Sequence, residues 1–223
     1  MNEATHFFTG FLIGTVGLKK EHHRFLPFFI AMAAILPDID QFLHLIIPID
    51  IFEHAVATHT LLGAFILTLI YTLISWAVGR KFFLEQKISL SFLLFAALLG
   101  MSSHLFLDIF TYRENIYTTN AHLYFWPLWD ISFHLNYFFH QDIFPNIYTV
   151  RILIEVIYSV VIGSYILFYQ WYHKKESPFA MLFPKNWLTY LPEEQVKERY
   201  RTVYGLFFVN LAILAVMAIS LFF

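Results

Sequence analysis

The chain has 223 residues, of which 59% are hydrophobic, 20% aromatic and 13% charged. This composition excludes an ordinary soluble domain and indicates an integral membrane protein. The net charge of -2 is too small to suggest a nucleic-acid partner. The absence of cysteine excludes disulfides, cysteine-based zinc sites and a thiol nucleophile.

The apolar runs predict an all-α fold, a polytopic transmembrane helical bundle that forms one membrane domain over residues 1–223. An N-terminal helical hairpin is expected first, and it should remain in the mature protein because the chain begins without signal-peptide features. About four clear spanning helices should follow, each long enough to cross about 30 Å of hydrocarbon. The hairpin is predicted over Phe7–Leu18 and Phe25–Leu36, and the spanning helices over His59–Gly79, Ile88–Phe110, Ile147–Tyr172 and Thr202–Phe223.

The basic residues predict the orientation of these helices. Nearly all of them fall in alternate connections, which the positive-inside rule places in the cytoplasm. The aromatic connection over residues 111–146 is then external, and several histidines and aspartates share the outer ends of their helices. The basic residues in question are Lys19, Lys20, Arg24, Arg80, Lys81, Lys87, Lys174, Lys175, Lys185, Lys197, Arg199 and Arg201.

Two pairs of polar residues interrupt the apolar sequence. His104 and Asp108 are four residues apart on a predicted helix, so they can share one ion or simply hydrogen-bond to each other. Asp38 and Asp40 follow Pro37, which should break the preceding helix and leave both carboxylates free to turn inward. One of them could instead cap the next helix, but two adjacent carboxylates favour a bound cation.

The remaining histidines differ in their context. Thr58 is predicted as the N-cap of a helix that starts at His59, with His54 in the preceding turn. A lone histidine is usually a structural or exposed residue, so we assign His22, His23 and His173 to the cytoplasmic surface and leave His44 undecided. His122, His134 and His140 lie in the aromatic connection and could close over the site.

Imidazoles and carboxylates without thiolates suit a divalent metal, most simply zinc, with manganese or iron as alternatives. Aspartate could bridge if two ions are held. Such a centre supports hydrolysis of an ester or phosphoester near neutral pH. The sequence has neither a Gly-x-Ser-x-Gly motif nor a phosphate-binding Gly-x-x-x-x-Gly-Lys loop that would compete with this chemistry.

The ordered motifs resemble the YdjM family of inner-membrane proteins over about residues 4–128. They are His6-x-x-x-Gly10, Leu36-Pro37-Asp38-Ile39-Asp40, His54-x-x-x-Thr58-His59-Thr60, His104-x-x-x-Asp108-x-x-Thr111 and Trp126-Pro127. The resemblance implies a membrane-bound metal-dependent hydrolase, distantly similar to zinc-dependent phospholipase C and S1/P1 nucleases. By matching positions it also implies a site formed by His6, Asp38, Asp40, His54, His59, His104 and Asp108.

One position departs from the family pattern. The family commonly has arginine directly after the first histidine of its His-Arg-x-x-Thr-His motif, and this chain has Ala55. Loss of an arginine that clamps a substrate phosphate would put phosphate recognition in doubt, unless Arg113 replaces it.

The leading hypothesis is therefore a hydrolase in the cytoplasmic membrane that acts on a lipid or lipid-linked substrate at the outer leaflet. Residues 1–128 would carry the metal-site core, and residues 147–223 would add two further helices. The predicted metal ligands are His6, Asp38, His59, His104 and Asp108, and the predicted catalytic residues are Asp38, Asp40 and His54. The alternatives are an ion-coupled or metal transporter, and a non-catalytic scaffold with a structural metal.

Overall fold

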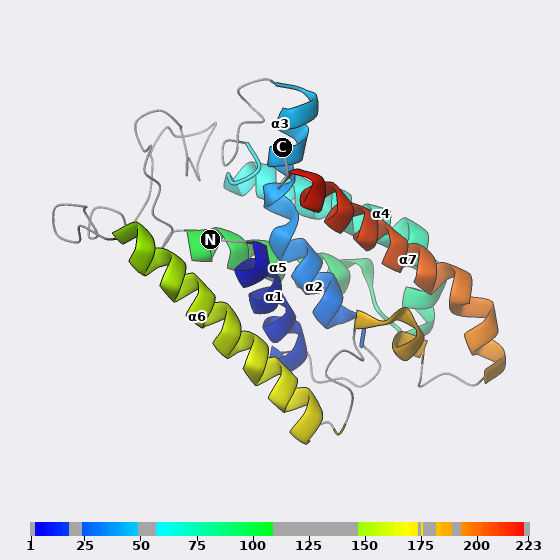
Figure 1. Ribbon diagram of the computed structural model, residues 1–223. Coiled ribbons are helices and arrows are strands. Elements are labelled where there is room, and N and C mark those ends of the chain that lie inside the picture. The colour runs from blue at the N-terminus through cyan, green and yellow to red at the C-terminus, as the bar shows by residue number, and fades with distance from the viewer. Residues whose placement is uncertain are drawn as a thin grey trace.

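The computed structural model describes residues 3–17, 24–48, 57–108, 147–173, 175, 182–188 and 193–220, and their regular secondary structure is entirely helical (Figure 1). The predicted fold class is therefore confirmed. The α-helices are α1 Glu3–Gly17, α2 Leu26–Ile35, α3 Ile39–Ile46, α4 Leu61–Glu85, α5 Leu90–Asp108, α6 Ile147–Phe168 and α7 Glu193–Ser220. Three short turns of other helix types are η2 Leu36–Asp38, η5 Tyr169–His173 and η7 Pro184–Leu188.

Three helical segments are long and apolar enough to cross a membrane: Leu26–Ile46, Leu61–Glu85 and Leu90–Asp108. The second and third correspond to predicted spans. The first contains the second arm of the predicted hairpin, which is longer than expected because α3 continues the helical path beyond Pro37. Within α6, Leu153–Phe168 forms a shorter apolar helix.

Two helices extend beyond their predicted ends. Helix α4 continues past Gly79 to Glu85, and α7 begins at Glu193 rather than at Thr202. Charged residues end an apolar run, but glutamate, lysine and arginine are good helix formers. Hydropathy therefore located the apolar part of each helix and not its termini.

A tight turn joins α4 to α5. Lys87 has a left-handed backbone with φ of 55°, and its N–H donates to the carbonyl of Leu84 at 3.0 Å. The N–H of Ile88 donates to the carbonyl of Phe83 at 2.9 Å, which completes a Schellman motif. The chain reverses here and α5 packs along α4, so the end of α5 returns to the start of α4.

Helix α2 is the centre of the bundle, and all ten of its residues are buried. It packs against α1 and α5 at glycines. A Cβ atom at Gly10 would lie 2.8 Å from the Cα of Ala31, and one at Gly100 would lie 2.4 Å from the carbonyl oxygen of Ile30. Small residues allow this close approach of helix backbones, which brings side chains from all three helices together at one end.

The last two helices pack against the outside of this core (Figure 1). Helix α6 lies along α1, where the hydroxyls of Thr5 and Ser159 are 2.8 Å apart. Helix α7 packs on α3 and α4, and the Tyr71 hydroxyl donates to Oδ1 of Asn210 at 2.7 Å.

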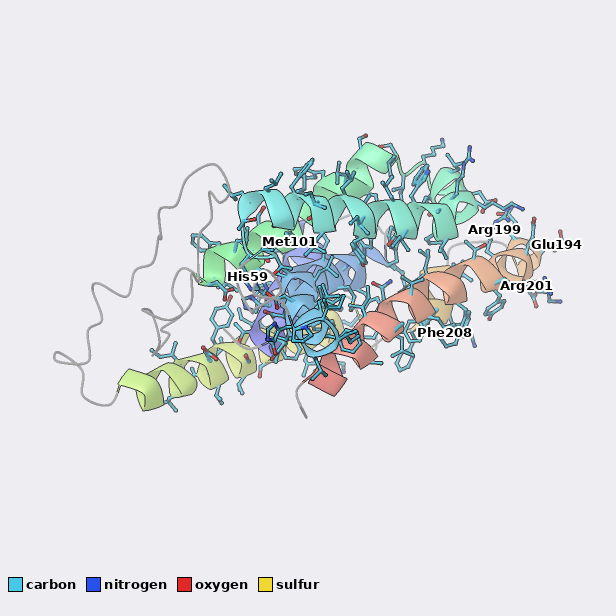
Figure 2. All side chains as sticks on the ribbon, turned by 90° about the horizontal axis from the view of Figure 1, so that it is seen from above. His59, Met101, Glu194, Arg199, Arg201 and Phe208 are labelled. Atoms are coloured by element: carbon cyan, nitrogen blue, oxygen red, sulfur yellow. The ribbon has the colours of Figure 1, made fainter. Side chains whose placement is uncertain are left out.

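His59 and the charged N-terminal part of α7 lie at opposite ends of the bundle. Figure 2 shows His59 near the start of α4, and the charged N-terminal part of α7, with Glu194, Arg199 and Arg201, at the far end. There Arg199 forms an ion pair with Glu85 of α4. The helix directions therefore agree with the predicted separation between basic connections and the histidine and aspartate residues.

Candidate metal centre

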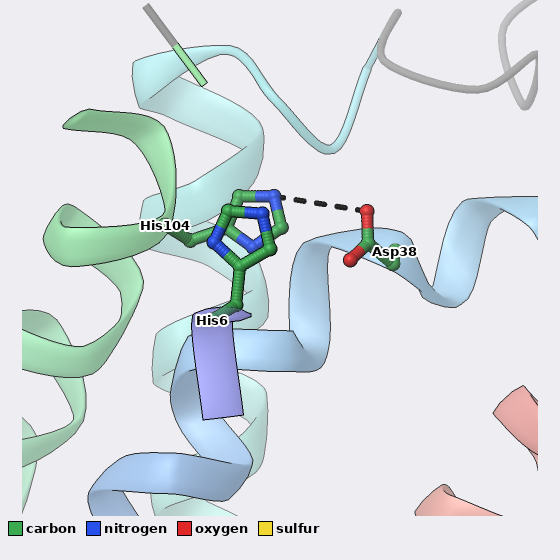
Figure 3. A group of neighbouring side chains, drawn as sticks. All are labelled: His6, Asp38 and His104. Atoms are coloured by element: carbon green, nitrogen blue, oxygen red, sulfur yellow. Dashed lines mark ion pairs between the residues drawn. The ribbon is translucent and has the colours of Figure 1, made fainter. Parts of the chain in front are cut away.

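Six ionisable side chains converge from the start of α1, the η2 turn, the start of α3, the residues just before α4 and the end of α5. Figure 3 shows three of them, His6, Asp38 and His104, which reach the same space from separate elements. Each of the six side chains belongs to a residue that is no more than 5% exposed. The full set is His6, Asp38, Asp40, His59, His104 and Asp108, which the sequence predicted; the seventh predicted residue, His54, lies outside the described residues.

The irregular geometry at Pro37 places the two neighbouring aspartates. The η2 turn Leu36–Asp38 interrupts the α-helical geometry, as predicted for a proline at this position. Asp38 occupies the N-cap position of α3 but makes no capping hydrogen bond with its side chain. Its Oδ1 lies instead 3.5 Å from Nε2 of His59 and 3.7 Å from Nε2 of His104. The capping interpretation therefore does not hold for Asp38.

The turn before α4 differs from its prediction. Thr60, and not Thr58, is the N-cap, and its Oγ1 accepts a hydrogen bond from the N–H of Gly63 at 2.9 Å. The hydroxyl of Thr58 donates to Oδ2 of Asp40 at 2.5 Å. His59 consequently precedes the helix and is held between two threonines, where its ring faces the other histidines.

Each of two imidazoles is held through its Nδ1 atom. Nδ1–H of His104 donates to the carbonyl oxygen of Ala34 at 2.7 Å. Nδ1 of His59 lies 3.3 Å from Oδ2 of Asp40 and 3.0 Å from Oγ1 of Thr58. Oriented in this way, a neutral imidazole presents the lone pair of Nε2, which is how a carboxylate or a backbone carbonyl prepares histidine to bind a metal.

The atoms that face the centre have the spacing of a coordination shell. Nε2 of His59 and Nε2 of His104 are 3.0 Å apart, and they lie 3.4 Å and 3.1 Å from Oδ2 of Asp108. Oδ1 of Asp38 is the fourth atom of this set, and it lies 3.5 Å and 3.7 Å from the Nε2 atoms of His59 and His104. The distances from the two imidazole nitrogens to each other and to these oxygens therefore range from 3.0 to 3.7 Å. A tetrahedron with metal–ligand bonds of about 2.0–2.2 Å has edges of roughly 3.3–3.6 Å. The four side chains therefore fit a divalent ion.

The electrostatics of the cluster require a positive charge. Asp38, Asp40 and Asp108 are buried together, and two imidazole nitrogens face each other within this group. Burial disfavours a charged His59, but hydrogen bonds to Asp108, Asp38 and Asp40 outweigh this effect and raise the pKa of His59 well above its ordinary value. Either a proton on His59 or a metal ion can supply the charge.

Some polar atoms of the cluster have no hydrogen-bond partner among the described residues. They are both ring nitrogens of His6 and Oδ2 of Asp38, all buried. Buried polar atoms are nearly always satisfied, so unsatisfied atoms at one place indicate a missing ligand. This observation also fits a metal site.

Two contributors to the site were not predicted. The sequence analysis assigned Thr58 to helix capping and gave the backbone of Ala34 no role. Pro37 was the one sequence signal that indicated a role for the Ala34 carbonyl. Proline has no N–H, and the chain continues in the tighter η2 geometry, so carbonyls near the end of α2 stay available to other donors. Nothing in the sequence distinguished the role of Thr58 from that of Thr60.

The other histidines do not extend this cluster within the described residues. His44 is half-buried on α3 and is not in either group of side chains that could hold a metal. His173 ends the η5 turn. The predictions for His22, His23, His122, His134 and His140, and for Ala55 and Arg113, concern positions outside the described residues.

The region of the chain that matches a known protein family includes all six residues of the cluster. The model of the YdjM inner membrane protein family matches residues 1–191. The chain belongs to the YdjM family. The match extends beyond the predicted limits of residues 4–128 and includes α6, so the YdjM region contains more than the helices that carry the cluster. Comparisons with curated proteins and with solved structures found no significant match.

Asp40 contacts Nδ1 of His59, the ring nitrogen that faces away from the proposed ion, and a substitution of Asp40 tests this contact. Asp40→Asn should weaken zinc or manganese binding by about 10–100-fold, because the variant loses the charge that holds Nδ1–H of His59. Titration of the metal-free protein in detergent would measure the affinity, with His44→Ala on the same helix as the control. An unchanged affinity would show that Asp40 does not orient His59, and complete loss of binding would place Asp40 among the ligands.

Proposed function

We propose that this YdjM-family protein is a membrane-bound hydrolase that uses a divalent metal to cleave an ester or phosphoester of a lipid or lipid-linked substrate. The ligands would be His59, His104, Asp38 and Asp108, and Asp40 would position His59. Zinc is the simplest choice for these nitrogen and oxygen donors, with manganese or iron as alternatives. His54 stays a prediction as a further catalytic residue.

One observation carries the proposal. Nδ1 of His104 faces a carbonyl oxygen, which can only accept, and Nδ1 of His59 faces Asp40 and Thr58, so with both rings neutral the two Nε2 lone pairs point at each other across 3.0 Å. Two lone pairs at this distance beside two carboxylates repel unless a proton or a metal ion lies among them. A proton on His59 would leave both ring nitrogens of His6 and Oδ2 of Asp38 unsatisfied, so the arrangement supports a bound metal better than a purely structural group of hydrogen bonds.

A divalent ion held by these side chains would activate water and stabilise negative charge on an ester or phosphoester oxygen. The protein's own contribution is to hold the imidazoles and carboxylates rigidly. Ala34 and Asp40 prevent the rings of His104 and His59 from rotating, and burial keeps bulk water away from the reacting group.

The surroundings of the cluster favour a lipid substrate. Phe106 lies between His104 and Asp108 on α5 and is 59% exposed, and Leu61 and Leu62 directly after Thr60 are 50% and 49% exposed. In a membrane protein such side chains face lipid, so the outer faces of the helices that carry the site border the hydrocarbon region at the depth of the site. A lipid headgroup could reach the cluster while its acyl or prenyl chains stay in the membrane.

We further propose that the site opens on the extracytoplasmic side. Arg24, Arg80 and Lys87 lie near the ends of α2, α4 and α5 that are remote from the cluster, where the positive-inside rule expects the cytoplasm.

The test is hydrolysis by purified protein in detergent with zinc or manganese added. Phospholipids and polyprenyl phosphates should be cleaved, and a metal chelator should abolish the activity. Water-soluble nitrophenyl esters and phosphates serve as the comparison, since they should be poorer substrates. Absence of cleavage of every lipid by fully metal-loaded protein would contradict the proposal.

A transporter is the second candidate, and a row of buried hydroxyls on α4 favours it. Thr68 and Thr72 are fully buried, and the hydroxyl of Thr72 has no hydrogen-bond partner among the described residues. Polar groups inside a span can line an ion pathway. Metal uptake into proteoliposomes that is lost in both Asp108→Asn and Thr72→Val would support transport; uptake that is absent in the unmodified protein would exclude it.

A further inference from the structure

We propose that the hydroxyls of Thr72 and Ser75 on α4, together with the hydroxyl of Tyr71, bind a water molecule inside the bundle. This site lies apart from the metal centre. Thr72 follows Thr60, the N-cap of α4, by twelve residues, which corresponds to about 18 Å along the helix. The water site does not depend on the proposed hydrolase, and it gives a role to two polar side chains near the middle of a helix that is long and apolar enough to cross a membrane.

The hydroxyls of Thr72 and Ser75 are fully buried and have no hydrogen-bond partner among the described residues. A threonine inside a helix can donate to the carbonyl four residues earlier. Thr9, Thr15 and Thr68 do so at 2.7–2.8 Å. Thr72 and Ser75 make no such bond, so their hydroxyls are available to a ligand in the packed interior.

A hydroxyl at this depth needs a partner, because the hydrocarbon region has no bulk water that could supply one. Buried polar atoms are nearly always satisfied by protein groups or by ordered water. Residues three apart on a helix have Cβ atoms roughly 5–6 Å apart. One water oxygen at about 2.8 Å from each hydroxyl oxygen can therefore join Thr72 to Ser75.

Tyr71 provides further partners for the water. Its single hydroxyl proton faces two acceptors, Oδ1 of Asn210 on α7 at 2.7 Å and the carbonyl oxygen of Phe29 on α2 at 3.2 Å, and it cannot serve both fully. The hydroxyl of Ser75 faces that of Tyr71 without completing a hydrogen bond to it. A water that accepts from Thr72 and Ser75 has two protons left, one for the Tyr71 oxygen and one for an acceptor beside it.

The distribution of charge favours water over a cation as the ligand. The acidic residue of α4 is Glu85, ten residues after Ser75, and those of α7 lie at least twelve residues before Asn210. Helix α2 has no acidic residue, and Asp108 of α5 belongs to the metal centre. An ion among neutral hydroxyls inside a membrane would lack a counter-charge, whereas water needs only hydrogen bonds.

The bound water joins helices from two parts of the chain. Asn210 lies on α7, beyond residue 191, where the match to the YdjM family ends. Through Tyr71 the water would connect the hydroxyls of α4 to this helix and to the centre of the bundle at Phe29. The hydroxyls of Thr72 and Ser75 would then hold a fixed molecule, in contrast to the ion pathway of a transporter.

Thermal unfolding of the full chain in detergent tests the site with Thr72→Val, Ser75→Ala and the double variant. Each single substitution should lower the midpoint by roughly 2–4 °C, because it removes a hydrogen bond to the water. The double variant should lose less than the sum of the two, because both hydroxyls hold the same water. Thr68→Val is the matched control: its hydroxyl bonds to the Ala64 carbonyl of its own helix, so its effect should add to that of Ser75→Ala.

A buried hydroxyl without any partner gives the opposite sign, because valine keeps the shape of threonine and removes the unsatisfied group. A higher midpoint for Thr72→Val, or strictly additive losses in the double variant, would overturn the inference. The midpoint of the unmodified protein should be equal in sodium chloride and choline chloride; stabilisation by sodium that Thr72→Val abolishes would replace the water with a cation.

A high-resolution structure of the unmodified protein keeps the inference testable if a variant fails to fold. It should show a solvent peak within hydrogen-bond distance of both Thr72 Oγ1 and Ser75 Oγ, and clear density for these side chains without such a peak would overturn the inference. None of these results changes the expected metal content, so the water site and the proposed hydrolase can fail separately.

Discussion

The double substitution His104→Ala with Asp108→Ala is expected to remove bound metal from the purified protein and to reduce lipid hydrolysis by more than about 100-fold. Loss of an outer partner that merely orients a ligand costs about 10–100-fold, so loss of two ligands should exceed that range. The remaining His59 and Asp38 would provide too few donors to retain an ion through dialysis.

Elemental analysis measures this effect directly, and the hydrolysis assay gives a second, independent readout. His44→Ala is the control because it removes an imidazole of the same bundle from outside the metal-binding groups. The double variant should still fold, since buried apolar residues such as Ile30, Leu93 and Met101 continue to pack α2 against α5. Full retention of metal in a folded double variant would refute the candidate centre.

The second large effect concerns packing. Gly100→Ala is expected to destabilise the protein by about 1–3 kcal/mol, the usual cost of overpacking a close interface. The new Cβ would lie 2.4 Å from the carbonyl oxygen of Ile30 and 3.0 Å from the backbone nitrogen of Ala34. For a chain of this size the midpoint of thermal unfolding should fall by roughly 3–10 °C.

The same substitution should also weaken metal binding. His104 lies one helical turn after Gly100, and its ring is held by the Ala34 carbonyl at 2.7 Å. Separation of α5 from α2 would lengthen this contact and release the ring.

Gly163→Ala on α6 is the matched control for Gly100→Ala. Its added Cβ would meet Phe8 at an ordinary 3.9 Å, so metal affinity should stay unchanged and stability should stay the same or rise by up to about 1 kcal/mol, the usual gain when alanine replaces glycine inside a helix. Unfolding monitored by tryptophan fluorescence in detergent compares the two variants. Equal stability of Gly100→Ala and the unmodified protein would mean that the α2–α5 contact is not a close backbone contact.

The sequence predicted much of the fold because lipid imposes a strong rule. Apolar runs of sufficient length must form helices, which satisfy their own backbone hydrogen bonds. This rule identified the apolar parts of α4 and α5. It did not predict that Leu26–Ile46 is long enough to span, because Pro37 suggested an end where the chain only changes to the tighter geometry of η2.

The members of the candidate site were also predictable in part. Aspartate and histidine are costly among apolar residues, so their positions alone marked them as candidates. The predicted helix directions then placed His6, Asp38, His59 and Asp108 at one end of the bundle, where the structure brings them together. The division of these residues between ligands and supporting groups was not predictable, because it depends on which atom of each ring faces the centre.

Composition and spacing by themselves determined that this is an all-helical membrane protein with histidines and aspartates gathered at one end of its helices. Tertiary structure alone decided that Thr58 supports Asp40 and that Ala34 holds His104. The reason is that these contacts join positions 18 and 70 residues apart, and no local pattern specifies which atoms of distant residues meet. Helix periodicity acts over a few residues, whereas the orientation of an imidazole depends on the packing of whole helices.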